Sequence, residues 1–203
     1  MMGKEKTMRK TMSEFLSYFL NNSLLLGAFI SIISSSITLL LQAYINKLLM
    51  ERGKTSIYYK AVYNKITSNP WGGYEENNEI YFDLPLWIEI HNTKGTKQIV
   101  RNLNLSLYSA GEFISKTKQS THSGETILAD NGSYSFLVDA GEIKRYDLEF
   151  IIKGKDIDFH DFDEVRLSYF DTNDKYIEYK IFDIEESWKQ SKYKISDDWK
   201  KLH

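Results

Sequence analysis

The feature that most constrains this chain is a run of 32 residues without a charged side chain, from Phe15 to Asn46. The 26 basic and 28 acidic residues all lie outside it. Crossing a bilayer core of ~30 Å takes about 20 apolar residues in a helix, and Leu24 to Ile45 provides them. This pattern excludes a plain cytosolic enzyme and a multi-span transporter.

We therefore predict one membrane-spanning helix within residues 14–53, with an interfacial start and with a basic polar tail over residues 1–13. A cleaved signal peptide is the alternative, but its apolar region usually spans only ~7–15 residues and ends at a small-x-small site. Here the apolar region is longer, and the helical pattern continues beyond Tyr44. A retained single-pass anchor is the favoured interpretation.

One face of the predicted span differs from the rest. Small, hydroxyl and amide residues recur there at steps of three and four, which places them on one stripe of a helix. Such residues allow helices to approach closely and to form hydrogen bonds with each other. The hypothesis is a helix–helix contact, with a second copy or another membrane protein. One alternative is that the hydroxyls bond their own helix, and another is that several such stripes line a water-filled path. The candidate association residues are Gly27, Ser31, Ser34, Ser35, Thr38, Gln42 and Asn46.

Orientation depends on the basic residues near each end of the span, because cytoplasmic flanks are enriched in Lys and Arg. Four of them precede the span and four follow it, so the count alone decides little. Lys65 and the uncharged buffer before the span shift basic charge slightly toward the C-terminal side. We expect the C-terminal domain to be cytoplasmic.

Beyond Lys54 the apolar period changes from 3.6 to 2, which is typical of strands. Alternating segments occupy residues 80–91, 99–108, 133–138, 143–152, 165–170 and 176–182, and edge strands are expected at 57–63 and 112–118. Pro85 inside such a segment suggests an edge or a bulge. Turn sequences such as Asn131-Gly132 and Asp139-Ala-Gly141 separate the segments. The fold class is therefore mainly β, with an antiparallel β-sandwich over residues 54–183 favoured over a small closed β-barrel.

Two of these segments carry a resemblance. The run from Leu86 to Gly95, followed by Ile99 to Tyr108, is similar to paired strands of immunoglobulin-like domains, and Asp139-Ala-Gly141-Glu resembles a turn found in them. The chain resembles uncharacterised bacterial single-span membrane proteins with an immunoglobulin-like domain. The cysteine and tryptophan core of antibody domains is missing, so the resemblance implies the fold class only and transfers no site.

The final segment, residues 184–203, returns to helical spacing. Trp188, Ile195, Trp199 and Leu202 form one apolar stripe among several lysines, so we predict a short C-terminal amphipathic helix. It packs on the sandwich in one interpretation. In the other, Trp188 and Trp199 lie at the membrane interface, where Trp and Lys both suit lipid headgroups.

Sequence motifs for catalysis are absent. The chain has no cysteine, and its four histidines lack metal-ligand spacing. The acidic run from Asp156 to Glu164 lacks the glycine and terminal glutamate of a calcium loop, so a solvated loop is favoured over a cation site. The net charge of −2 gives no support to nucleic-acid binding. We predict no catalytic residue, no metal and no cofactor.

These observations lead to two hypotheses for function. The first is a membrane-anchored, non-catalytic interaction module, in which the span associates through its polar stripe and the β-domain binds a partner protein. The second is a ligand-sensing membrane effector, loosely similar to phage-defence effectors, whose β-domain drives oligomerisation of the span and membrane disruption. Those effectors usually carry two spans. The expected partners are the lipid bilayer, a second copy or another membrane protein, and a protein at the β-domain.

Overall fold

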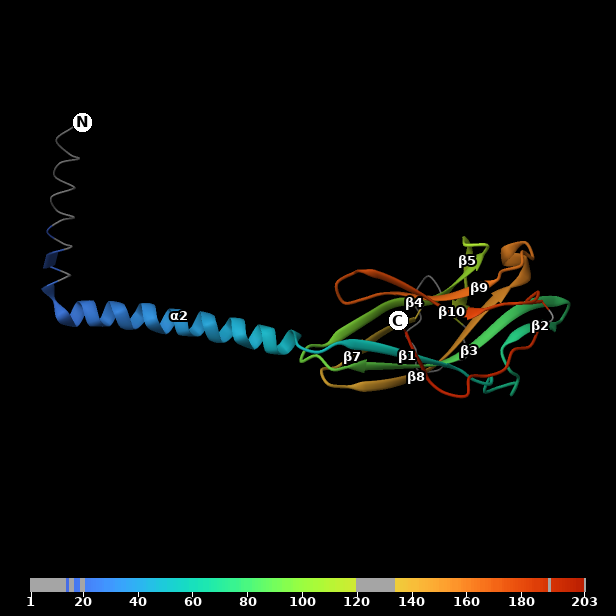
Figure 1. The fold of residues 1–203 in the computed structure, drawn as a ribbon, viewed down its shortest axis with the longest axis horizontal. Coiled ribbons are helices and arrows are strands. Elements are labelled where there is room, and N and C mark those ends of the chain that lie inside the picture. The colour runs from blue at the N-terminus through green and yellow to red at the C-terminus, as the bar shows by residue number, and fades with distance from the viewer. Residues whose placement is uncertain (1–13, 15–16, 19–20, 120–133, 190, 203) are drawn as a thin grey trace, which may run out of the picture. The chain divides into compact units, whose positions relative to one another are not determined.

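The computed structural model describes residues 14, 17–18, 21–119, 134–189 and 191–202. The chain divides into two compact units, residues 1–50 and 51–203 (Figure 1). The first contains an apolar helix and the second is built from strands. The predicted basic tail over residues 1–13 lies outside the described residues.

The apolar helix, α2, spans Ser23–Glu51. Asn22 caps its start, since its Oδ1 accepts hydrogen bonds from the backbone N–H groups of Leu24 at 3.2 Å and Leu25 at 3.4 Å. Its 29 residues extend about 43 Å at 1.5 Å per residue, and none of them is buried. The predicted apolar helix is confirmed. It is long and apolar enough to cross a bilayer, a property that signal sequences share. The expected interfacial start of the span is not continuous with α2, because Asn22 is non-helical and its side chain caps α2.

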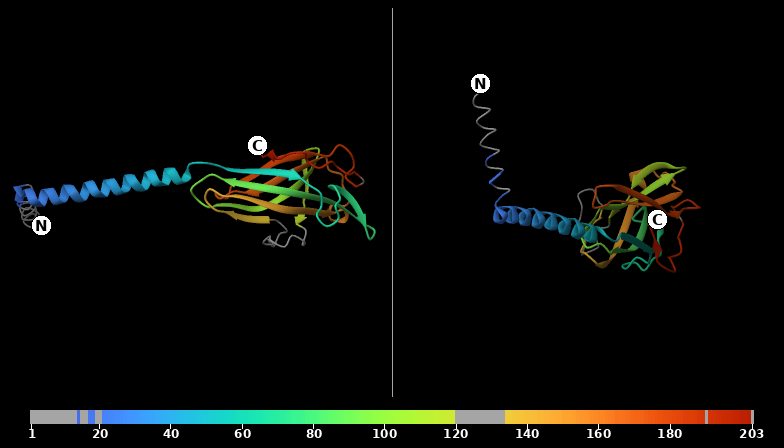
Figure 2. Two further views of the ribbon diagram at one scale, coloured as in Figure 1. Left: turned by 90° about the horizontal axis from the view of Figure 1, so that it is seen from below. Right: turned by 60° about the vertical axis from the view of Figure 1, so that its left-hand side comes forward.

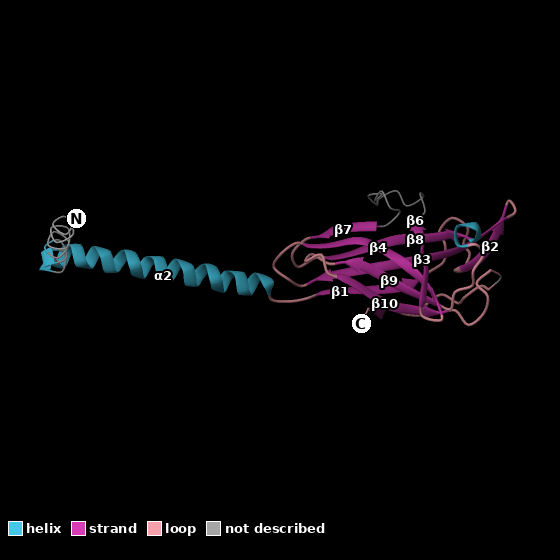
Figure 3. Ribbon diagram, turned by 90° about the horizontal axis from the view of Figure 1, so that it is seen from above, coloured by secondary structure: helices cyan, strands magenta, loops and turns pink. Residues whose placement is uncertain are grey.

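The second unit contains two antiparallel sheets (Figures 2 and 3). The first has the order β11 (Lys200–Lys201), β1 (Thr55–Ala61), β3 (Glu79–Asn92), β8 (Ile143–Lys153), β6 (Lys118–Gln119), and β2 (Gly72–Glu76) also pairs with β3. The second has the order β10 (Tyr176–Asp183), β9 (Glu164–Phe170), β4 (Gln98–Ser109), β5 (Glu112–Lys116), and β7 (Tyr134–Val138) also pairs with β4. The predicted mainly β class is confirmed. The described strands divide between two sheets, whereas a barrel closes one sheet on itself.

Alternating residues of the long strands form the core. The predicted inward rows are fully buried, and they join one hydrophobic cluster with residues of both sheets. Burying one Leu, Ile or Phe side chain contributes about 1.5–3 kcal/mol, so these rows determine which face of each sheet points inward. Their members are Phe82, Leu84, Leu86, Ile88 and Ile90 on β3 and Leu103, Leu105 and Leu107 on β4.

Pro85 lies in the middle of a sheet, and the pairing of β3 with β8 has no register shift, so its expected placement at an edge or a bulge is wrong. It pairs with Glu149 of β8, and its carbonyl accepts a hydrogen bond from the Val62 N–H at 3.1 Å. On the side of β3 opposite β8, the partner strand β1 ends at Ala61 and the next partner, β2, begins at Gly72. The missing N–H of Pro85 therefore faces the interval between two partner strands, where no ladder bond is lost.

The strand β2 was missed because its sequence carries little apolar alternation. It forms a hairpin with β3 through Asn77 and Asn78, both with positive φ, at 53° and 62°. Asparagine tolerates this left-handed region better than most residues, and a two-residue hairpin turn of this kind needs it at both positions. The hairpin extends the first sheet beyond the end of β1, where the pocket described below is found.

The predicted C-terminal helix is wrong. Residues 184–189 and 191–202 contain no helix. They run along the exposed edge of the first sheet, where the N–H groups of Tyr193, Ser196 and Leu202 donate to the carbonyls of Trp71, Ala61 and Ile57 at 2.9, 3.0 and 2.9 Å. Backbone groups at a sheet edge need partners, and this pairing outweighs the helical spacing of the side chains.

Candidate functional site

The predicted association residues all lie on α2 and are exposed. They are Gly27, Ser31, Ser34, Ser35, Thr38, Gln42 and Asn46. The Thr38 hydroxyl donates to the Ser34 carbonyl at 2.8 Å, and Ser36, outside the stripe, does the same to Ile32. The alternative of bonds within the helix therefore holds for Thr38. A Cβ added at Gly27 meets nothing within 4 Å, which leaves this surface open to close approach.

The two tryptophans proposed for a membrane interface have different environments. Trp188 is fully buried, and its indole N–H donates to the His160 carbonyl at 2.9 Å. It therefore lies in the core instead of on a lipid-facing surface. Trp199 is half-buried and stacks on Trp87 with ring centroids 6.3 Å apart. The Arg145 guanidinium lies 5.4 Å and 5.1 Å from these two rings.

The acidic run is divided among separate contacts. Asp156 pairs with Lys118 at 2.9 Å, while Asp161 accepts from the Ser187 hydroxyl at 2.8 Å. Asp163 accepts from a backbone N–H on another loop. Within the described ranges, no three His, Asp or Glu side chains gather as metal ligands would. Local contacts account for these carboxylates.

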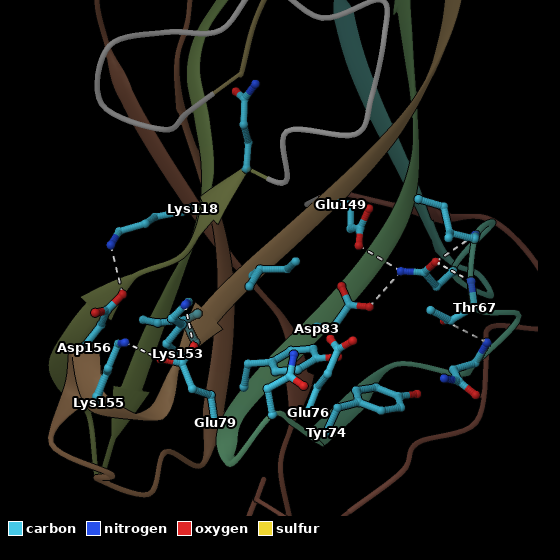
Figure 4. A pocket seen from close by; sticks show the side chains of 18 residues that line it. Thr67, Tyr74, Glu76, Glu79, Asp83, Lys118, Glu149, Lys153, Lys155 and Asp156 are labelled. Atoms are coloured by element: carbon cyan, nitrogen blue, oxygen red, sulfur yellow. Dashed lines mark hydrogen bonds and ion pairs between the residues drawn. The ribbon is translucent and has the colours of Figure 1, made fainter.

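The most defined concave site lies on the outer face of the first sheet, opposite the core. It is a pocket of about 890 Å³ lined by β2, β3, β8, β6, η1 (Gly154–Ile157) and the loop after β1 (Figure 4). This volume suits a small molecule or a long side chain. We call it the Asp83 pocket, and its main residues are Asn64, Tyr74, Tyr81, Asp83, Glu149 and Lys153.

Asp83 reaches this pocket because it occupies the outward phase of β3, between the inward Phe82 and Leu84. It is only 4% exposed. Its Oδ2 accepts a hydrogen bond from Asn64 Nδ2 at 3.0 Å, and its Oδ1 is buried without a hydrogen-bond partner. A buried carboxylate oxygen with no donor is costly. The side-chain amide of Gln119, which also lines the pocket, is likewise buried without a hydrogen-bond partner.

Asn64 holds two carboxylates together. Its Nδ2 also donates to Glu149 Oε1 at 2.8 Å, while its Oδ1 accepts from the N–H groups of Ile66 and Thr67 at 2.9 and 3.1 Å. Every polar atom of the side-chain amide is thus engaged, and the loop fixes its direction. Two acidic groups from neighbouring strands are consequently kept close to one another (Figure 4).

The pKa of Asp83 is raised from 3.8 to about 7. Burial is the main cause, because it penalises the charged form. The hydrogen bond from Asn64 and the charge of Lys192 lower the pKa, and the charge of Glu149 raises it. Near neutral pH this carboxyl group is accordingly divided between its charged and neutral forms.

The opposite rim of the pocket is ion-paired. Glu79 contacts Lys153 at 2.5 Å and also Lys155, and these hydrogen bonds lower the pKa of Glu79 to about 2. Lys118 pairs with Asp156. On this rim three lysines pair with the two carboxylates of Glu79 and Asp156, whereas Asp83 and Glu149 form no ion pair with the residues that the structure describes.

Sequence reasoning missed this site. Asp83 appears in the sequence only as the polar member of an alternating strand, and Asn64 and Glu149 are 19 and 66 positions away along the chain. The one usable signal was an aspartate two residues before a strand proline. That signal is too weak to predict a pocket, because it does not show that the loop after β1 folds back over the sheet.

No protein-family model matches this chain, and no curated protein matches it.

Titration of Asp83 leads to a prediction about stability. The folded protein holds this proton more tightly than the unfolded chain, so unfolding releases it between the ordinary pKa of 3.8 and about 7. The free energy of unfolding therefore falls as the pH rises through this window and levels off above it. We expect Asp83→Asn to remove this fall, which amounts to a difference on the order of 4 kcal/mol between pH 4 and pH 8.

The measurement is urea unfolding of the full-length wild type and of Asp83→Asn at several pH values between 4 and 8, with tryptophan fluorescence as the readout. Glu185→Gln, which removes an exposed carboxylate, is the control and should follow the wild-type curve. Parallel pH curves for wild type and Asp83→Asn would contradict the prediction.

Proposed function

We propose that this chain is a membrane-anchored, non-catalytic interaction module. The observation that carries the proposal is the combination of an apolar helix with no buried residue and a β unit that has one hydrophobic core cluster and a pocket on its outer sheet face. The helix supplies location and association. The β unit presents its surface to a partner protein.

The finer architecture is part of the same proposal. The helix α2 is a retained single-pass span, the C-terminal unit lies on the cytoplasmic side, and its two sheets form an immunoglobulin-like sandwich. The support is the length of α2, the slight shift of basic charge toward the C-terminal side of the span and the two antiparallel sheets around one core. The experiment that tests the function is purification of the full chain in mild detergent, with its oligomeric state and copurifying proteins measured together.

The span associates through its polar stripe in this proposal. Changing Ser31, Ser35 and Gln42 together to leucine replaces small and polar side chains with bulky apolar ones and blocks close approach. We expect self-association in detergent to weaken at least tenfold, or a copurifying membrane protein to be lost. Sedimentation equilibrium and affinity purification of the full chain measure these two outcomes.

A matched control exchanges Ile33→Leu and Leu40→Ile, on the opposite face of α2, which keeps the hydrophobicity while altering shape. It should leave association unchanged. If the triple variant associates as wild type does, the stripe has no role in helix contact.

A second candidate function is a ligand-sensing membrane effector, and the Asp83 pocket favours it because its volume of about 890 Å³ is that of a small-molecule site. In this function a ligand in the β unit promotes assembly of α2 and membrane disruption. Overexpression should then be toxic, and toxicity should require Ser31, Ser35 and Gln42. An interaction module is harmless alone and copurifies with a partner, so a growth assay distinguishes the two.

A further inference from the structure

The charge in the Asp83 pocket is unevenly distributed. On one rim Glu79 and Asp156 are neutralised by lysines. On the other side Asp83 and Glu149 share a single neutral donor, the amide of Asn64. Within the described part of the chain neither carboxylate has an ion pair, and the charge of Lys192 compensates that of Asp83 only in part, so this side of the pocket carries net negative charge.

A second observation points to a ligand there. Asp83 lines the pocket, and its Oδ1 is buried without a hydrogen-bond partner. Glu149 is held next to it by the shared donor (Figure 4). A donor group bound between these two side chains would satisfy the orphan oxygen and neutralise the excess charge together.

The adjoining wall is aromatic. Tyr74 and Tyr81 stack with ring centroids 5.9 Å apart, and both line the pocket. The Lys192 ammonium lies 3.0 Å from the Tyr74 ring centroid and bonds the Gly73 carbonyl, so a cation already contacts one of these rings within the fold. Aromatic faces next to carboxylates favour organic cations, because the ring quadrupole attracts positive charge.

We propose that the Asp83 pocket binds an organic cation, an alkylammonium or guanidinium group, which donates to Asp83 Oδ1 and to Glu149. The inference rests on the proposed binding function and names the chemistry of its ligand. Two sources present this group: the Lys or Arg side chain of a partner protein, and a free small amine or guanidine.

The test uses the full chain in mild detergent at pH 8 and isothermal titration. The small-molecule probe is agmatine, with neutral N-butylurea as its control. The side-chain probe is the blocked peptide acetyl-Gly-Arg-Gly-amide, with the neutral citrulline peptide as its control. We expect at least one cationic probe to bind about tenfold or more tightly than its neutral control, since a charge-assisted contact in a buried site is lost in the control. Binding of agmatine alone indicates a small-molecule source, and binding of the peptide alone indicates a partner's side chain.

Two variants locate the site. Asp83→Asn should weaken cation binding about tenfold or more, and Glu149→Gln should weaken it as well. Glu185→Gln, outside the pocket, should leave affinity unchanged within twofold. Near-UV circular dichroism checks that each variant is folded. If Asp83→Asn does not fold, the affinity of Glu149→Gln decides whether the cation binds in this pocket.

Several results would overturn the inference: no binding of either cation, equal binding of the neutral controls, or equal binding by the wild type and both pocket variants. Its failure is distinguishable from failure of the proposed function. A chain that still copurifies with a partner, but binds no cation, retains the interaction role and loses only this ligand assignment.

Discussion

Replacing Trp188 by alanine is expected to lower the free energy of unfolding by about 3–5 kcal/mol. The ring is fully buried, stacks on Phe162 with centroids 5.6 Å apart and meets Phe82 edge-on at 6.3 Å. Its N–H also bonds the His160 carbonyl. Removing the ring leaves a cavity and an unpaired carbonyl together.

The size of this effect matters because native domains are stable by only about 5–15 kcal/mol. Urea unfolding of the full chain in detergent, followed by near-UV circular dichroism, gives the difference. Trp199→Ala is the control, since Trp199 is half-buried and stacks at the surface, and it should cost about 1 kcal/mol or less. Equal losses in the two variants would show that Trp188 does not anchor the core.

Replacing Gly73 by alanine is expected to displace the C-terminal segment, at a cost of about 3 kcal/mol. A Cβ on Gly73 would overlap the Trp188 carbonyl oxygen and lie 2.6 Å from that of Lys189. Both obstacles are backbone atoms, so neither can rotate away. The Gly73 N–H also donates to the Ser191 carbonyl at 3.0 Å, a bond that would break if the segment shifted.

Hydrogen exchange of the full chain measures this displacement directly. Amides of residues 191–196 should lose protection in Gly73→Ala, while those of β4 keep theirs. Gly141→Asn is the matched control, because a Cβ there meets nothing within 4 Å and asparagine tolerates the φ of +69°. Unchanged protection in Gly73→Ala would show that the close approach is not required.

Much of the fold was predictable from local pattern. Alternation identified the inward rows of β3 and β4, because a period of two assigns every second side chain to one face. The absence of charge identified α2. Two expectations, the edge placement of Pro85 and the helix over residues 184–203, are wrong because a distant partner decides the structure of each segment. The sequence around Pro85 predicts an edge because it does not show the interval between β1 and β2 on one side of β3.

The candidate site was the least predictable part. Asp83 becomes distinctive only through burial, and its burial depends on the loop carrying Asn64 and on Glu149 of β8. None of these residues forms a motif with another along the chain. Their proximity follows from strand order, which sequence spacing does not encode.

The sequence by itself determined that one apolar helix precedes a mainly β unit, and which rows of that unit face inward, because charge and alternation act residue by residue. Only the tertiary structure decided that Trp188 enters the core, that residues 191–202 follow a sheet edge instead of forming a helix, and that Asp83 is buried with an unpartnered oxygen. Each of these depends on backbone hydrogen bonds and packing between distant segments, and such contacts outweigh local spacing when they satisfy an otherwise open edge.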